Sequence, residues 1–217
     1  MKKIERIDRL RRYAAVITLI FASTATAVFA DPDTGTPENL TPTDVVKTAI
    51  SDVLNDMRNH ESLYEQEPAR LDELVRQKVV PYFDFSRMTR LAMARYWNSA
   101  SASQRLDASD AFQNLFIVTY GKQLFDYRNT TAKVEALPGA TEQKANLKLK
   151  ANSQRGEYVT LFLRLEKQAE KWHIIDVNAD GVSYIVTMRG QFSETLSQQG
   201  VDGLIKFLND SAQKKAS

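Results

Sequence analysis

The 217-residue sequence contains no cysteine and only two histidines, His60 and His173. Without cysteine the chain has no disulfide, no thiol nucleophile, no thiolate ligand for a metal and no attachment point for an N-terminal lipid. Two distant histidines do not supply the three or four clustered ligands that a metal site needs. A Gly-x-Ser-x-Gly motif and a glycine-rich phosphate loop are also lacking. The sequence therefore predicts no catalytic residue, no metal and no cofactor.

Long apolar runs are lacking after residue 30, so no later segment is predicted to span a bilayer. The first twelve residues, MKKIERIDRLRR, are basic, and an uncharged run over residues 13–30 ends in Val-Phe-Ala. This pattern predicts a secretory signal peptide over residues 1–30, cut before Asp31. The alternative is a membrane anchor, but the second half of the run, ASTATAVFA, is too rich in Ser, Thr and Ala to favour one.

The charge of the chain depends on that segment. The whole chain carries a formal +2, whereas residues 1–30 hold six basic and two acidic side chains, which leaves −2 for residues 31–217. A mildly acidic body without a basic block gives no electrostatic reason to bind nucleic acid. An exported domain without cysteine must also be stabilised by core packing alone.

Apolar residues recur at helical spacing in the first and last parts of the chain. The predicted helices cover residues 42–57, 68–80, 101–127, 186–199 and a short last segment from 202. Thr41 fits an N-cap because Pro42 follows at the first helical position. Pro81 and Gly200 are typical helix ends.

The middle of the chain instead alternates between apolar and polar residues, which predicts strands. The predicted strands are residues 132–137, 144–152, 157–167 and 171–178. Short turns join them, so we expect an α+β protein with helices packed on one antiparallel four-stranded meander sheet. The expected divisions are a signal peptide over 1–30, a polar N-terminal tether over 31–43, a single domain over 44–210 and a C-terminal tail over 211–217.

Two aspartates stand in apolar surroundings, and each has two interpretations. Asp176 begins the run DVNADG, which resembles the first half of a calcium loop, but Thr187 stands where a bidentate glutamate is needed. A strand that ends in an Asp-Gly turn explains the same residues. Asp84 fits a helix N-cap better than a general base. An isomerase or hydratase acting on a small apolar ligand through Asp84 or Asp176 remains an alternative function.

The sequence is rich in large apolar side chains and poor in residues that could carry out catalysis. Phe112, Phe116, Tyr120 and Leu124 form a wide stripe on the long predicted helix, and the third strand alternates Val159, Leu161 and Leu163 on one face. These stripes fit either a large core or a cavity for an apolar ligand, and periodicity does not separate the two. The stretch VVPYFDFSRMTRLAMARYW, residues 79–97, combines five aromatic rings with three arginines.

Several blocks also carry a family resemblance. PYFDFSRMTRLAMARYW, QRLDASDAFQNLFIVTYGKQL, WHIIDVNADGVSYIVTMRGQF and QQGVDGLI resemble the MlaC family in order and spacing, over about residues 44–208. The resemblance implies a monomeric periplasmic phospholipid carrier of Gram-negative bacteria, with acyl chains in a deep apolar pocket. It further implies two partners, an inner-membrane ABC transporter with MCE domains and an outer-membrane lipoprotein–porin complex. A ligand-free interaction module of the periplasm is a further alternative.

Under this resemblance the apolar residues of the aromatic stretch, the helical stripe and the strands would line the pocket. The residues expected to bind lipid are Tyr82, Phe83, Phe85, Met88, Leu91, Phe116, Tyr120, Leu124, Val159, Leu161, Leu163, Trp172, Ile174, Val182 and Ile185.

Overall fold

The computed structural model describes residues 40–152 and 158–216. The predicted signal peptide, most of the predicted tether and the turn expected at residues 154–156 lie outside the described residues. The helices are α2 (Pro42–Asn59), α3 (Glu61–Gln66), α4 (Arg70–Lys78), α5 (Phe85–Met93), α6 (Ala102–Leu124) and α7 (Tyr184–Ala216). Short 3-10 turns are η1 (Val80–Tyr82), η2 (Ala94–Ser99) and η3 (Phe125–Tyr127).

The strands form one antiparallel sheet in chain order. They are β1 (Thr131–Ala136), β2 (Lys144–Asn152), β3 (Tyr158–Gln168), β4 (Lys171–Ala179) and β5 (Val182–Ser183). The α+β class and the meander are confirmed, but the sheet has five strands and not the expected four. The fifth has two residues, which is too short to show any alternation in the sequence.

The helices begin where the sequence places capping residues. Thr41 and Asp44 form a capping box, in which the Thr41 side chain accepts from the Asp44 N–H and the Asp44 side chain accepts from the Thr41 N–H. Ser101 and Gln104 form a second capping box at the start of α6. Each box satisfies two backbone N–H groups that the helix itself cannot pair.

The break predicted at Gly200 is present as a kink inside α7, where Gly200 has φ 69°. A positive φ is readily adopted only by glycine, so the helix changes direction there. Helix α7 starts at Tyr184, two residues before the predicted start. It then continues to Ala216, through the residues expected to form a C-terminal tail. Helix α3 was not predicted, since its single buried residue, Tyr64, leaves no helical stripe to recognise.

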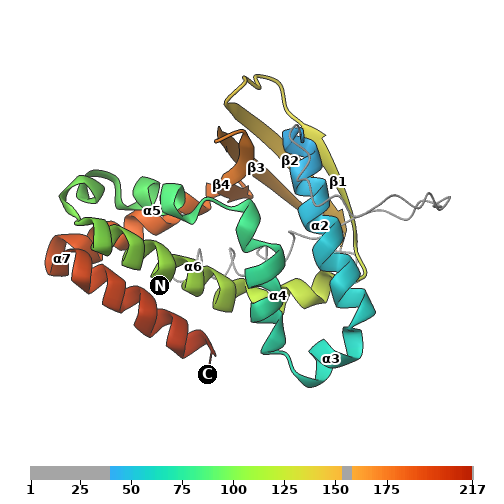
Figure 1. The fold of residues 1–217 in the computed structure, drawn as a ribbon, viewed down its shortest axis with the longest axis horizontal. Helices are drawn as coiled ribbons and strands as arrows, with labels where there is room; N and C mark the ends of the chain where they lie inside the picture. The colour runs from blue at the N-terminus through green and yellow to red at the C-terminus, as the bar shows by residue number, and fades with distance from the viewer. Residues whose placement is uncertain (1–39, 153–157, 217) are drawn as a thin grey trace.

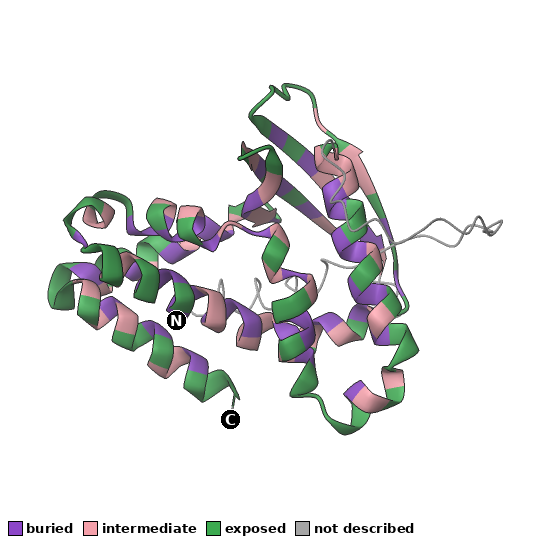
Figure 2. Cartoon of the chain, viewed as in Figure 1, coloured by how far each residue is buried: buried purple, intermediate pink, exposed green. Residues whose placement is uncertain are grey.

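One hydrophobic core joins the sheet to the helices. Helix α2 packs on β1 and β2, α4 packs on α2 and α6, and α6 runs beside α7 (Figure 1). Buried and exposed residues alternate along the strands (Figure 2), so one face of the sheet joins the core. The space between that face and α5, α6 and α7 holds the side chains considered next.

Candidate functional site

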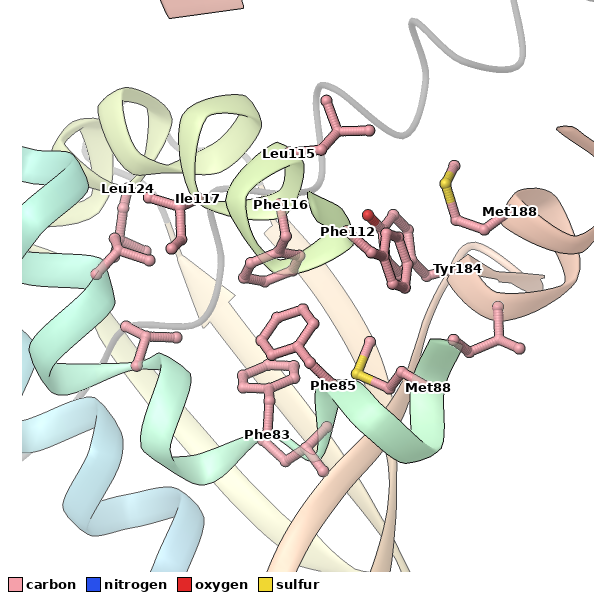
Figure 3. Packing of buried hydrophobic residues seen from close by; sticks show 14 of the residues in the cluster. Phe83, Phe85, Met88, Phe112, Leu115, Phe116, Ile117, Leu124, Tyr184 and Met188 are labelled. Atoms are coloured by element: carbon pink, nitrogen blue, oxygen red, sulfur yellow. The ribbon is translucent and has the colours of Figure 1, made fainter. Parts of the chain in front are cut away.

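Aromatic side chains from three parts of the chain meet in the core. We call this group the ring cluster; its members are Phe83, Phe85, Phe112, Phe116, Tyr120, Tyr184 and Phe192. Figure 3 shows most of them pointing toward one another from the segment around α5, from α6 and from α7. Edge-to-face and stacked ring pairs contribute beyond their buried area.

Helix α6 supplies the central rings of the cluster. The Phe112 ring stacks on Tyr184 with centroids 5.6 Å apart and an interplanar angle of 8°. Phe116 lies 5.3 Å from both Phe83 and Phe85, and 5.0 Å from Tyr120. Phe112, Phe116 and Tyr120 stand four residues apart in the sequence, so α6 carries their rings on one face.

The start of α5 is fixed to the sheet, and this positions the two rings that flank Asp84. The Asp84 N–H donates to the Ile174 carbonyl of β4 at 3.0 Å. The Asp84 side chain then accepts from the Arg87 N–H at 2.8 Å, which caps the helix. Phe83 and Phe85 are therefore held against α6 by a backbone anchor and a cap together.

A cavity of about 130 Å³ adjoins the ring cluster, and we call it the α6–α7 cavity. Tyr120 and Tyr184 belong to both, and the cavity lies between α6 and the two arms of α7. Its lining residues are Leu115, Thr119, Tyr120, Tyr184, Thr187, Met188, Gln191, Phe207, Ser211 and Lys215. Lys215 is exposed and stands at the rim, so the walls are apolar or uncharged.

Burial raises the pKa of the Tyr120 hydroxyl and of the Tyr184 hydroxyl. Desolvation of the phenolate is the main cause for both groups. Both hydroxyls are therefore neutral throughout the physiological range. The inner wall of the α6–α7 cavity can offer hydrogen bonds, but it presents no charge to a ligand.

A second cavity, of about 360 Å³, lies at the start of α5 and is lined in part by the core rings Phe83 and Phe85. Its walls include the carboxylates of Asp84 and Asp110 and the side chains of Gln168 and His173. Although this polar cavity is larger, burying an acyl chain against carboxylates and amides would desolvate them without compensation. The smaller α6–α7 cavity is therefore the better site for an apolar ligand.

The structure places nearly all of the predicted lipid-binding residues in the hydrophobic core or against it. The residues that belong to the core cluster or pack against it are Tyr82, Phe83, Phe85, Met88, Leu91, Phe116, Tyr120, Leu124, Val159, Leu161, Leu163, Trp172, Ile174 and Ile185. Val182 is the exception, because it lies in β5 with 38% of its surface exposed. The strand residues Val159, Leu161 and Leu163 border neither of the two cavities described above.

Of the residues of α7, the sequence predicted only Ile185 as lipid-binding and missed those that form its helical stripe. Tyr184 and Met188 line the α6–α7 cavity, and Phe192 packs edge-on against Phe112 at 5.2 Å. With Leu196 these residues recur every fourth position, which is a helical stripe visible in the sequence. The stripe begins at Tyr184, directly after an Asp-Gly turn and a two-residue strand. The predicted helix began two residues later and therefore did not include Tyr184.

The aspartates of the enzyme alternative have structural contacts. Asp84 accepts from Arg87 N–H with one oxygen and from Gln168 Nε2 with the other, at 2.8 and 2.7 Å. Asp176 accepts from the Ser183 hydroxyl at 2.7 Å and from the Ile185 N–H at 3.1 Å. Each carboxylate therefore joins two segments of the fold.

The calcium interpretation of residues 176–181 is not supported by this geometry. Asp180 and Gly181 both have positive φ, 50° and 79°, and form the turn between β4 and β5. Such a turn is the usual role of Asp-Gly between paired strands. Within residues 40–152 and 158–216, no three His, Asp or Glu side chains gather as a metal site would require.

The capping role of Asp84 gives a direct prediction. We expect Asp84→Ala to lower the free energy of unfolding by about 1–2 kcal/mol, because the first turn of α5 loses its cap. Asp84→Asn is the matched control, since asparagine caps equally well. Urea unfolding of the three proteins measures both effects. Equal stability of Asp84→Ala and the unsubstituted chain would contradict the capping role.

Within residues 40–152 and 158–216, no helix combines the length and the apolar character needed to cross a bilayer.

Comparison with known proteins places the chain in a defined group. The family model described as MlaC protein matches residues 47–210. The fold is similar to that of a phospholipid-binding protein from Ralstonia solanacearum, solved in complex with a phospholipid. The TM-score is 0.73 and the identity 33%, over 81% of this chain and 98% of that one.

Two curated relatives are each 22% identical to this chain. The toluene tolerance protein ttg2D of Pseudomonas putida aligns over 75% of this chain and 76% of its own length. The intermembrane phospholipid transport system binding protein MlaC of Haemophilus influenzae aligns over 95% of both chains. The similarity to these relatives thus extends over most of each molecule.

Proposed function

This chain belongs to the MlaC family, and we propose that it is a phospholipid-binding transport protein. The acyl chains of the bound phospholipid occupy the ring cluster and the α6–α7 cavity. One observation carries the proposal. A cavity whose lining is uncharged apart from the exposed Lys215 reaches buried aromatic rings, in a chain 33% identical to a protein solved with a bound phospholipid. A site of that kind is suited to hydrocarbon.

The energetics favour a carrier without a chemical step. Burying one methylene is worth about 0.8 kcal/mol, so exposing a chain of about sixteen carbons to water costs on the order of 12 kcal/mol. A phospholipid therefore leaves a bilayer readily only if an equally apolar site receives it. Exchange between such sites is nearly isoenergetic and needs no catalytic group.

The ligand must widen the site. The α6–α7 cavity, at about 130 Å³, has the volume of about four water molecules at liquid density. It thus holds only a short part of an acyl chain. We propose that the rest enters as the rings of Phe116, Tyr120 and Tyr184 move apart, which forms the deep pocket that the family resemblance implies. Aromatic and methionine side chains suit this, because they form adaptable apolar walls.

The proposal assigns different roles to the predicted site residues. Those nearest the α6–α7 cavity, Phe116 and Tyr120, contact the acyl chain first. Phe83, Phe85 and Met88 form the opposite wall, and the residues of β3 and β4 form the floor. Val182 receives no role in lipid binding because it is exposed and lies outside the cluster.

The wider transport cycle is part of the same proposal. The protein acts in the periplasm after export and carries phospholipid between two membrane assemblies. The partners are an outer-membrane lipoprotein–porin complex and an inner-membrane ABC transporter with MCE domains. Membership of the MlaC family supports this cycle, as does the intermembrane transport role named for the Haemophilus influenzae relative.

The test is to look for bound lipid. We expect residues 31–217, expressed in a bacterial host and purified without detergent, to carry diacyl phospholipid in stoichiometric amount. Native mass spectrometry measures the loaded fraction, and organic extraction identifies the lipid. The same chain after delipidation is the control for adventitious lipid, because it should reload from vesicles. A spectrum with apoprotein alone, before and after exposure to vesicles, would favour a ligand-free interaction module.

A further inference from the structure

The outer face of the sheet, which points away from the core, is uncovered over β2 and β3. On β2 every second residue is buried, whereas Lys144, Asn146 and Lys150 on the other side are exposed. On β3 the same alternation leaves Tyr158 and Phe162 outward. In the described part of the chain, the helix that packs on β2 is α2, and it covers the buried side (Figure 1).

Positive charge collects on this outer face. Strand alternation and pairing register place six cationic side chains on it: Lys133, Lys144, Lys148, Lys150, Arg164 and Lys171. Three acidic side chains share the face, which leaves a net +3. Because residues 31–217 together carry −2, the remainder of that segment carries −5. The outer face therefore differs in sign from the rest of the protein.

The three acidic side chains of the face are already engaged. Glu135 pairs with Lys133 at 2.8 Å, and Glu166 pairs with Arg87 of α5 at 3.0 Å. Asp176 is buried and accepts the two hydrogen bonds described above. Within the described residues, the other five cations of the face form no ion pair; they are Lys144, Lys148, Lys150, Arg164 and Lys171. Their charge is available to a partner.

The lysines also lie close to one another. Lys133 and Lys150 are direct cross-strand partners, a like-charge arrangement that opposes sheet formation. The positive field is visible at Glu135, whose pKa is lowered first by Lys133 and further by Lys150 and Lys148. An anionic surface placed against this face would relieve the repulsion.

Two exposed aromatic rings stand among the cations. Tyr158 is 81% exposed and Phe162 is 39% exposed, and both project from the same side of β3. The Lys148 ammonium lies 5.8 Å from the centre of the Phe162 ring. Exposed rings flanked by lysines resemble the groups that proteins place at the headgroup level of a bilayer.

We propose that the outer face of the sheet docks the protein onto an anionic phospholipid bilayer. A bilayer fits better than an acidic protein because five of the six cations are lysines. Lysine is depleted in protein–protein interfaces, where arginine is enriched. The α6–α7 cavity does not open on this face, and the polar cavity reaches it only at Gln168 and His173, near the turn between β3 and β4. Lys144, Lys148 and Lys150 therefore border no pocket for a protein anchor. Lysines act on anionic lipid as point charges that need no fixed geometry.

This docking goes beyond the proposed cargo binding, and it orients the molecule. The acidic remainder of the protein is repelled by the same bilayer, so the sheet faces the membrane and the helices face away. The assay below measures attachment to vesicles and not cargo. A failure of the docking proposal therefore leaves the proposed function unaffected.

The test uses residues 31–217 and flotation with vesicles of phosphatidylcholine, with or without phosphatidylglycerol. We expect binding only to the vesicles with phosphatidylglycerol, and weaker binding as salt is raised. In Lys144→Gln with Lys150→Gln the partition coefficient should fall by about 25-fold, since each lysine near an anionic surface contributes about fivefold. Both side chains are exposed, and Lys150→Gln removes a like-charge pair with Lys133, so a thermal melt should show no loss of stability.

The matched control removes the same charge from the helices. Lys47→Gln with Lys122→Gln alters two exposed lysines of α2 and α6 and should leave the partition coefficient within about twofold of the unsubstituted chain. Equal binding to both kinds of vesicle would overturn the proposal, as would equal loss in the two double variants. Absence of vesicle binding at low salt would also overturn it and would leave an acidic protein as the occupant of this face.

Discussion

In a Thr187→Trp protein we expect the affinity for phospholipid to fall by at least about fifteenfold while the fold stays intact. Thr187 is half-buried and lines the α6–α7 cavity. An indole at this position would fill the space that the proposal gives to the acyl chain. Excluding two methylenes already costs about 1.6 kcal/mol, which is about fifteenfold in affinity.

The neighbouring residue provides the control. Val186 is one position away in the same helix, 62% exposed and outside the cavity, so Val186→Trp should bind lipid normally. Equilibrium exchange with vesicles measures the affinity of each protein. Denaturant unfolding of the delipidated proteins measures the fold, where filling an existing cavity should change the free energy by less than about 1 kcal/mol. Normal lipid affinity in a stable Thr187→Trp protein would contradict the assignment of the cavity.

We expect Phe112→Ala to lower the free energy of unfolding by about 3–5 kcal/mol. The Phe112 side chain has no exposed surface, and its ring contacts Phe85, Tyr184 and Phe192 at 5.2 to 6.1 Å. Alanine removes these contacts and leaves a cavity where α5, α6 and α7 meet. A loss of this size is a large part of the stability of an ordinary domain.

Phe207→Ala is the control for the loss of a ring. Phe207 lies on α7 and is 38% exposed, so its truncation should cost clearly less than that of Phe112. Urea unfolding of delipidated protein compares the two variants at one temperature, because bound lipid would itself stabilise the folded state. If Phe112→Ala lowered the free energy of unfolding by less than about 1 kcal/mol, the centre of the ring cluster would not be tightly packed.

The sequence anticipated those parts of the fold that depend on neighbouring residues. The alternation of apolar and polar residues over 144–152 predicted β2 with its observed ends. In a half-buried strand the polarity of each residue indicates which side of the sheet it faces. Thr41, Asp84 and Gly200 act where predicted, since caps and kinks need only a few adjacent residues. Helix α3 and strand β5 lack such a signal because they are short or mostly exposed.

The site depended on more than local pattern. Phe116 and Tyr120 were recognised as large apolar residues on one helical face, but the sequence did not say whether that face met solid core or a cavity. That depends on the separation of α6 from the two arms of α7, and Gly200 sets the angle between those arms. Tyr184 went unrecognised although it stacks on Phe112, because the contact joins residues far apart in the chain.

Taken alone, the amino-acid sequence determined the longer helices, four of the five strands, several caps and the order of the meander, because these follow from the residues along one segment. It also carried the MlaC resemblance, which the family match confirms. Only the tertiary structure decided which apolar faces meet, where a cavity is left between them, and that six cations share one uncovered face of the sheet. These features depend on distances between segments, and no periodicity within a segment encodes them.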